Sequence, residues 1–455
     1  MGRNTQSAKE TLPDRVEPEK IMQTSLWSIA HKAALRREHR FQNLMREFTP
    51  KHLAWCWQQL NKKASPGIDK ITAREYGKDL WKNVTELLEC FKRGGYRAKL
   101  VLRKYIPKAG WKKRPLGVPA TEDKILQMAS AKILEAIYEA DFRDCSHAFR
   151  PERSAKGAAI ELSRRLQFGN FNYIVEADIR SYFDSIDHEI LLDMLKIRID
   201  DKNFLNLIRK WLKAGIFEKD GKIIKPETGT PQGGVISPVL SNIYLHYVLD
   251  EWFEDVVAQH CIGNVFICRY ADDFVCAFQN LYDAERFYKV LGKRLAKFGL
   301  KTADEKTKII EFSQKNTKDG NRFDFLGFEF RWGLSRKKKP LVKLRTSKKK
   351  YKAALATIAD WCRKNRHLRM TTLFREINSK LRGHYNYFGV IGNYECMSDY
   401  FYKVVRLLFK WLNRRSQRKS YTWEGFNVLQ KHFRIERPRI TQKKKQVQFS
   451  LFNAR

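Results

Sequence analysis

The sequence predicts an α+β fold, because strand-forming runs in hairpin order precede a long helical region. Residues 265–269 (VFICR) and 274–278 (FVCAF) are two short apolar runs separated by four residues, a spacing typical of an antiparallel hairpin. Both faces of these runs are apolar, which indicates a central, largely buried pair of strands. From about residue 348 to residue 412 the apolar residues recur at helical spacing, and this pattern predicts a C-terminal helical domain.

The N-terminal part of the chain is expected to be mainly helical. Residues 1–24 are polar and charged and are expected to form a tail before a helix that begins near residue 25. Helical periodicity runs through most of residues 25–61 and stops at the loop 61–72, which contains a proline and a glycine. Residues 74–92 predict a further helix, and residues 97–106 alternate as a strand does.

Further elements are expected in the middle of the chain. The segment 171–179 (FNYIVEADI) predicts a strand, after which the apolar residues change from alternation to helical spacing. This strand carries a carboxylate, Asp178, near its C-terminal end. Helices are also predicted from about residue 121 to 140, over 241–258 and over 281–298, and a second hairpin is predicted around 324–332.

Two adjacent carboxylates, Asp272 and Asp273, occupy the turn of the first predicted hairpin. Carboxylates near an apolar core repel each other and are poorly solvated, and the usual relief is a hard divalent cation. An ordinary polar turn has the same short motif. Asp178 lies 94 residues earlier on a strand of similar character, and antiparallel pairing of these strands brings the three carboxylates together. Such a group can hold two divalent ions around a reacting phosphate.

The charge of the chain indicates a polyanionic partner. The 455 residues contain 89 Lys and Arg against 50 Asp and Glu, a formal net charge of +39. Residues 331–455 alone carry 33 basic against 6 acidic residues, with aromatic residues between the lysine runs. A lysine run is often only a solvated surface. Runs that recur over more than a hundred residues, however, predict nucleic-acid binding.

The cysteines and the N-terminus exclude several protein classes. No CxxC pair occurs among the eight cysteines, so zinc-finger spacing is absent. Cys261, Cys268 and Cys276 lie in or beside apolar segments and are expected to be reduced thiols in a cytosol-like compartment. The N-terminus has no apolar stretch, so neither a signal peptide nor a membrane span is expected.

Five motifs follow one another in the order found in reverse transcriptases: ADIRSYFDSIDH, TPQGGVISP, RYADDFV, GLKTADEKTKI and FLGFEF. The segments IPKAGWKKRPLGVPATEDKILQMA, HAFRPERSAKGA and LRGHYNYFG also resemble the group II intron-encoded reverse transcriptases, or maturases. The resemblance covers about residues 60–425. It implies a right-hand polymerase with fingers and an antiparallel palm sheet, followed by a helical thumb or maturase domain.

The resemblance also implies a domain order. After the tail of residues 1–24, a helical N-terminal extension with a template-covering loop spans 25–92, fingers and palm span 93–330, the thumb or maturase (X) domain spans 331–420, and a basic candidate DNA-binding segment spans 421–455. The sequence ends at Arg455 without the paired cysteines and histidines of the endonuclease module found in many family members. The endonuclease-lacking type is therefore expected.

Carried over to this sequence, the resemblance implies that Asp178 and Asp272 bind both catalytic Mg²⁺ ions, for which Mn²⁺ is an expected substitute. The carbonyl of Ile179 is implied as a further ligand, and Asp273 as the more peripheral carboxylate. Lys306 resembles a lysine proposed to protonate the leaving pyrophosphate. An exposed lysine at a helix start is the simpler interpretation of that position.

Four further residues are expected to meet the dNTP substrate. Lys108 and Arg114 flank a turn in the fingers and resemble the residues that clasp the triphosphate. Gln232 stands before two glycines and resembles the residue that contacts the nucleotide sugar or the templating pair. Phe183 resembles the residue that blocks space near the sugar 2′ position and so favours deoxynucleotides. Core packing is the alternative role for this phenylalanine.

Three weaker features have two interpretations each. Residues 325–328 resemble the primer grip, although an apolar strand has the same pattern. Arg150 and Arg153 are candidates for template phosphate contacts or for structural salt bridges. The loop 65–69 resembles the part of the N-terminal extension that lies over template RNA, but it also fits a generic turn.

The resemblance implies an RNA-directed DNA polymerase that acts on an RNA template and a DNA primer. It is also expected to bind group II intron RNA and so to assist splicing and retromobility. Target DNA is a further expected partner, with no membrane partner and no predicted oligomeric state. One alternative is a domesticated relative in DNA repair, phage defence or CRISPR adaptation. Another is an RNA-binding splicing factor that does not need polymerase activity. A prokaryotic cytoplasm, in nucleoid- or RNP-associated form, is expected, with an organellar origin as the alternative.

Overall fold

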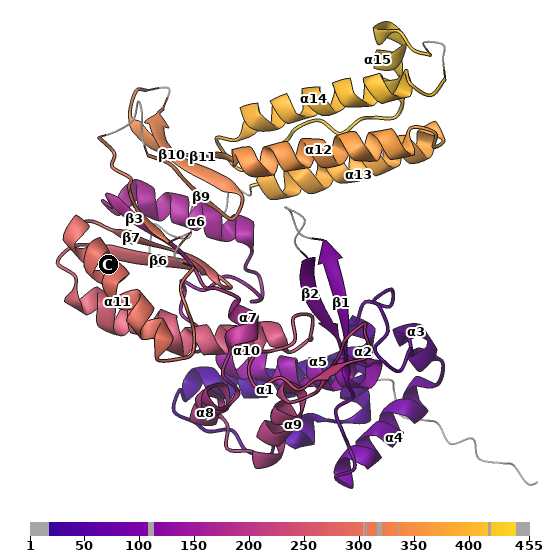
Figure 1. Ribbon diagram of the computed structural model, residues 1–455, viewed down its shortest axis with the longest axis vertical. Coiled ribbons are helices and arrows are strands. Elements are labelled where there is room, and N and C mark those ends of the chain that lie inside the picture. The colour runs from indigo at the N-terminus through magenta and orange to yellow at the C-terminus, as the bar shows by residue number, and fades with distance from the viewer. Residues whose placement is uncertain are drawn as a thin grey trace, which may run out of the picture. The chain divides into compact units, whose positions relative to one another are not determined.

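The computed structural model describes residues 18–107, 113–303, 305, 307–315, 321–335, 337–416 and 420–442 (Figure 1). The chain forms two compact units that are built from interleaved segments. Unit 1 comprises residues 1–143, 181–250 and 297–300, and unit 2 comprises residues 144–180, 251–296 and 301–455. Each unit therefore draws its core from distant parts of the sequence.

Unit 1 is mainly helical. Its helices are α1 (Pro18–Leu35), η1 (Leu44–Glu47), α2 (Pro50–Gln59), α3 (Ala73–Tyr76), η2 (Gly77–Asp79), α4 (Leu80–Lys92), α5 (Thr121–Tyr138), α7 (Tyr182–Ser185), α8 (His188–Arg198), α9 (Lys202–Leu212), α10 (Ser237–Leu245) and η3 (His246–Asp250). Helix α5 is central, because Ile125, Ala129, Ile133 and Ile137 recur every four residues and are fully buried. It packs against α1, α2 and α10.

The strands of unit 1 form a small sheet. Its strands are β1 (Val101–Pro107), β2 (Lys113–Val118), β4 (Ile216–Phe217) and β5 (Ile223–Ile224), in the order β2-β1-β4-β5. β1 and β2 form an antiparallel hairpin, and β1 pairs with β4 in parallel. Arg114 pairs with Ile106 near the tip of that hairpin.

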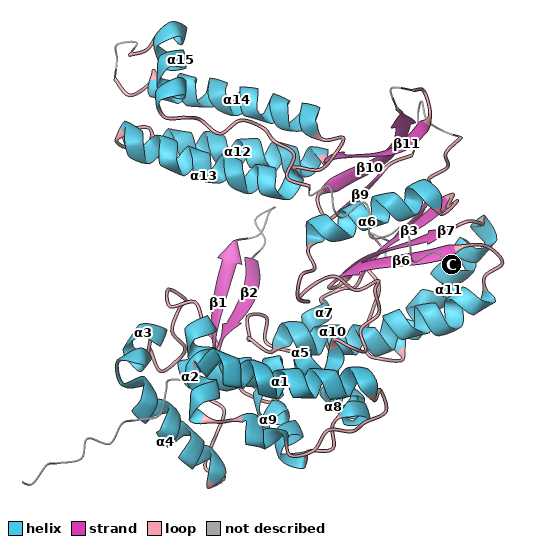
Figure 2. Cartoon of the chain, turned by 180° about the vertical axis from the view of Figure 1, so that it is seen from behind, coloured by secondary structure: helices cyan, strands magenta, loops and turns pink. Residues whose placement is uncertain are grey.

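Unit 2 contains the central antiparallel sheet. Its strands are β3 (Tyr173–Asp178), β6 (Val265–Tyr270), β7 (Asp273–Phe278) and β8 (Lys308–Glu311), in the order β6-β7-β3-β8. Helix α6 (Ala155–Phe168) covers one face and helix α11 (Leu281–Ala296) covers the other (Figure 2). Cys268 and Val275 pack with α6, and the ring of Phe278 lies 5.3 Å from that of Phe287 on α11.

The rest of unit 2 is a second sheet followed by a helical bundle. These elements are η4 (Trp252–Val257), η5 (Ala258–His260), β9 (Phe323–Phe325), β10 (Phe328–Leu334), β11 (Pro340–Thr346), α12 (Lys348–Asn365), α13 (Met370–Phe388), α14 (Tyr394–Leu412) and α15 (Trp423–His432). On α13, Leu373, Ile377, Leu381 and Tyr385 lie one turn apart and are buried in the bundle core. The predicted α+β fold with a helical C-terminal region is confirmed.

Several predicted elements have different limits in the structure. The helical region 25–61 begins at Pro18 and is broken after Leu35, and Asn43 takes a left-handed φ of 54° within that break. The predicted helix 74–92 is interrupted at Gly77, where a Cβ atom would lie 2.1 Å from the Trp57 ring. This break depends on a tertiary contact, which a local pattern does not reveal.

The helix predicted over 241–258 is present, but it changes from α to π geometry. Helix α10 ends at Leu245, and the turns η3 and η4 that follow are π-helical. In the ranges that the structure describes, no helix combines the length and the apolar character needed to cross a membrane.

Candidate active site

Three carboxylates lie at one end of the β6-β7-β3 sheet. β3 ends at Asp178 and β7 begins at Asp273, and the antiparallel register places these two residues directly opposite each other. Opposed residues of an antiparallel pair point to the same face, with Cβ atoms about 4.5–5.5 Å apart. Asp272 lies in the turn that joins β6 to β7. The predicted antiparallel pairing of the Asp178 strand with the hairpin is therefore confirmed.

The turn of the hairpin is tighter than the four-residue spacing suggested. β6 extends to Tyr270, which pairs with Asp273, so only Ala271 and Asp272 lie outside the strands. Ala271 takes a left-handed φ of 57°, as two-residue hairpin turns require. Asp272 is half-buried, whereas Asp273 is exposed. The two adjacent carboxylates consequently lie in different environments.

The backbone after Asp178 is held by the segment that follows α11. The Ala303 amide donates to the Asp178 carbonyl (2.8 Å), and the Arg180 amide donates to the Lys301 carbonyl (2.9 Å). These two bonds flank Ile179, whose side chain is buried. They fix the peptide units on both sides of Ile179, and a fixed carbonyl is what the expected metal ligand requires.

The donor set of this sheet end suits a hard divalent cation. Asp178, Asp272, Asp273 and the Ile179 carbonyl all offer oxygen, the ligand that Mg²⁺ and Mn²⁺ prefer. Among the described residues, no three His, Cys, Asp or Glu side chains already surround one point. Because like charges repel, the carboxylates are expected to stay apart without a cation. A bound cation would draw together groups that the sheet has already placed side by side.

In unit 1, the loop that carries Gln232 is fixed to the β1-β2 hairpin. The Gly117 amide of β2 donates to the Gln232 carbonyl at 2.6 Å. Gly233 takes a φ of 112°, and a Cβ there would lie 2.7 Å from the Gly117 carbonyl oxygen, so only glycine fits. The side-chain oxygen Oε1 of Gln232 is buried and accepts no hydrogen bond from the described residues. A buried acceptor of this kind is normally satisfied by a ligand or by water.

Phe183 belongs to the same neighbourhood of unit 1. Its carbonyl accepts a hydrogen bond from the Thr230 amide at 2.7 Å, which connects α7 to the Gln232 loop. The Phe183 ring is half-buried and meets the Tyr182 ring edge-on, with centroids 5.4 Å apart. The structure thus brings together two predicted nucleotide contacts that lie 49 residues apart in the sequence.

Arg114 acts on this region through its charge. Partial burial raises the pKa of Asp184 above its usual value, and the positive charges of Arg103 and Arg114 partly oppose this rise. The exposed Arg114 side chain is therefore within electrostatic range of α7. Lys108 and Lys306, the other two predicted phosphate contacts, lie outside the described residues.

The loop between β9 and β10 is braced by the helical bundle. Leu326 and Gly327 both have positive φ, of 51° and 80°, which makes the hairpin tight. The Tyr387 hydroxyl donates to the Leu326 carbonyl at 2.8 Å, and the Tyr387 ring stacks on Phe328 with centroids 5.7 Å apart. Burial raises the pKa of Tyr387, and Tyr270 raises it further, so this brace lies near the end of β6.

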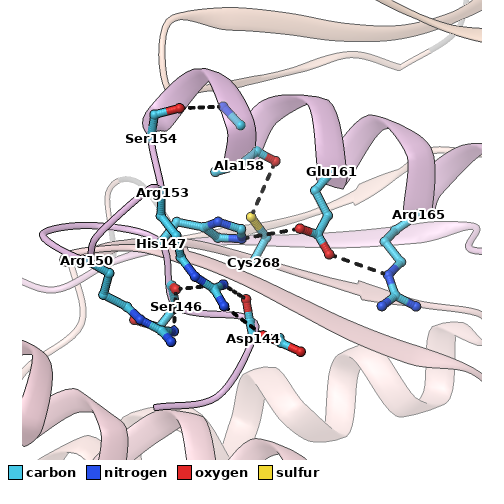
Figure 3. A network of polar contacts seen from close by, with 11 residues as sticks. Asp144, Ser146, His147, Arg150, Arg153, Ser154, Ala158, Glu161, Arg165 and Cys268 are labelled. Atoms are coloured by element: carbon cyan, nitrogen blue, oxygen red, sulfur yellow. Dashed lines mark hydrogen bonds and ion pairs between the residues drawn. The ribbon is translucent and has the colours of Figure 1, made fainter. Parts of the chain in front are cut away.

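Arg150 and Arg153 take part in a network that holds their own segment (Figure 3). The Arg153 guanidinium donates to the Asp144 carboxylate and to the Asp144 carbonyl, both at 2.7 Å. Both arginines also donate to the Ser146 carbonyl, at 2.9 Å from Arg150 and 3.3 Å from Arg153. These contacts favour the structural interpretation of the two arginines over template binding.

Sequence reasoning missed Arg269 and Ser146. Arg269 is fully buried at the end of β6 and contacts both Ser146 and Ala271. The signal was present in the sequence, since Arg269 is the one charged residue in the otherwise apolar run VFICRY. A buried charge next to a metal-binding motif predicts a specific partner.

Two family models match the chain. The model described as reverse transcriptase (RNA-dependent DNA polymerase) matches residues 106–330, and the model described as group II intron, maturase-specific domain matches residues 351–428. The protein YkfC of Escherichia coli is 35% identical over 279 residues, which cover 54% of this chain and 73% of YkfC. The chain belongs to the group II intron reverse transcriptases.

Other relatives of this group II intron reverse transcriptase match over shorter stretches. The group II intron-encoded protein LtrA of Lactococcus lactis subsp. cremoris is 43% identical over 188 residues, 41% of this chain. A putative COX1/OXI3 intron 1 protein of Saccharomyces cerevisiae is 37% identical over 172 residues, 38% of this chain and 20% of its own length. The chain spans 30% of the length of LtrA.

Mg²⁺ is expected to stabilise the wild-type protein but not the Asp178→Asn variant. A ligand that binds only the folded state stabilises it by about 2.7 kcal/mol at 100 times its Kd. Thermal unfolding across a Mg²⁺ titration measures this effect. Without a cation, Asp178→Asn is expected to be at least as stable as wild type, because one of two opposed carboxylates is neutralised.

The matched control is Asp193→Asn, which changes an exposed carboxylate on α8 that is paired with Lys196. This control is expected to retain the full Mg²⁺ response. An equal Mg²⁺ response in Asp178→Asn and Asp193→Asn would contradict a metal site at the end of β3.

Proposed function

We propose that the protein is an RNA-directed DNA polymerase that extends a DNA primer on an RNA template. The observation that carries the proposal is the opposition of Asp178 and Asp273 beside the turn that contains Asp272. These carboxylates would hold two Mg²⁺ ions, or Mn²⁺ as a substitute, which would supply Lewis-acid activation of the primer hydroxyl and charge stabilisation of the leaving pyrophosphate. Membership of the reverse transcriptase family supports the same reaction.

The chain's own contribution to this reaction is positioning. Asp178 and Asp272 would hold the ions, and the fixed Ile179 carbonyl would add a neutral ligand. We assign Asp273 a larger role in metal binding than the resemblance implied, because the register places it directly opposite Asp178. Ligands on two paired strands keep their spacing during the reaction, so little reorganisation is needed at the reacting phosphate.

The dNTP is proposed to bind through residues of unit 1. Arg114 offers a bidentate guanidinium and Lys108 a mobile ammonium to the triphosphate. Gln232 presents a buried carbonyl oxygen to the nucleotide. Phe183 fills the space beside the sugar 2′ position. Lys306 is proposed as the proton donor to pyrophosphate on its motif alone.

The maturase domain is proposed to bind group II intron RNA. A hollow of about 480 Å³ is lined by Arg363, Lys364, Arg366, His367 and Arg415. Helix α12 has 18 residues and so extends about 27 Å at 1.5 Å per residue, which places this hollow at the end of α12 away from β11. We refer to its five lining residues as the distal basic cluster.

The distal basic cluster carries more positive charge than its carboxylate partner can balance. Within the described residues, Arg363 and Lys364 are paired with the same carboxylate, Asp360. Arg366, Arg414 and Lys410 all lie within 6 Å of the Trp411 ring centroid. Cations around an aromatic ring suit RNA, which proteins recognise largely through phosphates, 2′-hydroxyls and stacking.

Two other roles use parts of the same site. A domesticated relative in DNA repair, phage defence or CRISPR adaptation would have the same polymerase chemistry, and the presence of a ribozyme intron around the coding region distinguishes it. A splicing factor that does not need polymerase activity would not require the carboxylates at the sheet end. Target DNA and a nucleoid- or RNP-associated place in a prokaryotic cell remain part of the proposal.

Primer extension on an RNA template with Mg²⁺ and dNTPs tests the polymerase. The wild type is expected to make cDNA, and Asp272→Ala is expected to lose activity by about 10³-fold or more, because the metal ligands act as a unit. Asp193→Ala is the control with a surface carboxylate removed. No cDNA from the wild type, or normal cDNA from Asp272→Ala, would refute the polymerase.

Phe183→Ala tests the sugar gate. A smaller side chain leaves room for a 2′-hydroxyl, so the ratio of kcat/KM for dNTP to that for rNTP is expected to fall by about 10-fold to 200-fold. Single-nucleotide incorporation measures both values. If the ratio is unchanged while the melting temperature falls, Phe183 serves core packing instead.

Salt dependence tests RNA binding by the distal basic cluster. Affinity for intron RNA is expected to fall steeply as salt rises, because phosphate contacts release counterions. Arg366→Gln is expected to reduce the slope of log K against log salt by about one, as is usual for one lost phosphate contact. Lys82→Gln on α4, a surface lysine opposite Glu86, is the charge-matched control. An unchanged slope for Arg366→Gln argues against RNA at this cluster.

A further inference from the structure

A guanidinium is completely buried at the end of β6. Arg269 has an exposed fraction of 0%, and it is among the largest fully buried side chains of the described protein. The other residues of β6 are apolar or aromatic. Burying a charged group is costly unless hydrogen bonds satisfy it, so this arginine is expected to have a definite task.

The Arg269 side chain bridges the turn of the hairpin. Its Nη1 atom donates to the Ala271 carbonyl at 3.2 Å, and its Nη2 atom donates to Oγ of Ser146 at 2.7 Å. Ala271 has a left-handed φ of 57°, an unfavourable conformation for a residue with a Cβ. The carbonyl that Arg269 contacts belongs to the peptide unit shared by Ala271 and Asp272. The contact therefore fixes the orientation of the peptide plane that directly precedes the Cα atom of Asp272.

Ser146 is itself firmly held. The Arg269 amide donates to the Cys145 carbonyl (2.8 Å), and the His147 amide donates to the Arg269 carbonyl (3.0 Å), which forms a parallel bridge at the edge of β6. The Ser146 carbonyl accepts the hydrogen bonds from Arg150 and Arg153 described above (Figure 3). Ser146 has no exposed surface. Ser146, which accepts the hydrogen bond from the guanidinium, is thus held against the sheet by backbone hydrogen bonds.

The histidine next to Ser146 adds no further positive charge to this network. Burial, together with the positive charges of Arg153, Arg150 and Arg269, lowers the pKa of His147 to about 4. His147 is therefore neutral near pH 7, with its Nε2 atom 4.0 Å from Glu161. The Nη1 and Nη2 atoms each donate to a neutral oxygen, the Ala271 carbonyl and the Ser146 hydroxyl. A lysine ammonium on a flexible stem lacks this planar fork.

We propose that Arg269 is a positioning residue for the metal site: anchored on Ser146, it holds the Ala271–Asp272 peptide so that the Asp272 carboxylate faces the catalytic ions. This inference rests on the proposed polymerase function for its kinetic readout, whereas its metal-binding readout stands independently. Residues behind the ligands of a metal site commonly change metal affinity or activity by 10-fold to 100-fold when they are replaced.

The test compares Arg269→Lys and Ser146→Ala with wild type in Mg²⁺ titrations of thermal unfolding and of primer extension. Arg269→Lys is expected to raise the half-saturating Mg²⁺ concentration by about 10-fold to 100-fold and to lower kcat by a similar factor. Its KM for dNTP is expected to change by less than about twofold, because the nucleotide contacts are elsewhere. Ser146→Ala is expected to shift Mg²⁺ dependence in the same direction by a smaller factor.

The matched control is Arg198→Lys, which makes the same change at a buried arginine of unit 1 that is paired with Asp141 at 3.2 Å. It is expected to lower the melting temperature while leaving the half-saturating Mg²⁺ concentration unchanged. Equal Mg²⁺ dependence in Arg269→Lys and wild type overturns the proposal. If Arg269→Lys does not fold, an unchanged Mg²⁺ dependence in Ser146→Ala overturns it.

The outcomes for the two proposals are distinct. A wild type that makes no cDNA refutes the polymerase, but its Mg²⁺-dependent unfolding still reports on Arg269. A wild type that makes cDNA, together with an Arg269→Lys variant that has normal Mg²⁺ dependence, refutes only the positioning role.

Discussion

The antiparallel pairing of β3 with β7 is the constraint on which the candidate active site depends. It places Asp178 opposite Asp273, although carboxylates repel each other when they share one face of a sheet. The pairing is maintained by apolar burial on both faces, with α6 on one and α11 on the other. The sheet can therefore hold an arrangement that is unfavourable by itself and becomes favourable when a divalent cation binds.

The sequence contains enough information to predict the elements of this site but not their register. The runs around Asp272 and Asp273 predict a hairpin, and the strand that ends at Asp178 follows from its apolar pattern. Whether Asp178 faces Asp272 or Asp273 depends on the register between β3 and β7, because a shift by one residue reverses every side chain. The left-handed Ala271 makes a two-residue turn, and alanine gives no local signal for that conformation.

Long-range contacts account for the other features that local patterns do not show. Position 77, where a predicted helix is interrupted, requires glycine because its backbone packs on Trp57. The chain passes repeatedly between the two units, whereas a change of composition marks only contiguous segments. Phe183 and Gln232 become neighbours through backbone bonds such as the one from Thr230 to Phe183. Motif order predicted that both residues act on a nucleotide, but only the fold explains how they meet.

Arg269 and the distal basic cluster show two opposite uses of positive charge. The arginines and lysines of the cluster are hydrated, so their energy of interaction with phosphate is salt-dependent and individually modest. Arg269 is removed from water, where a charge tolerates only precise partners. Two of its contacts go to neutral oxygens, which orients the turn without using the Asp272 carboxylate as an acceptor in either bond.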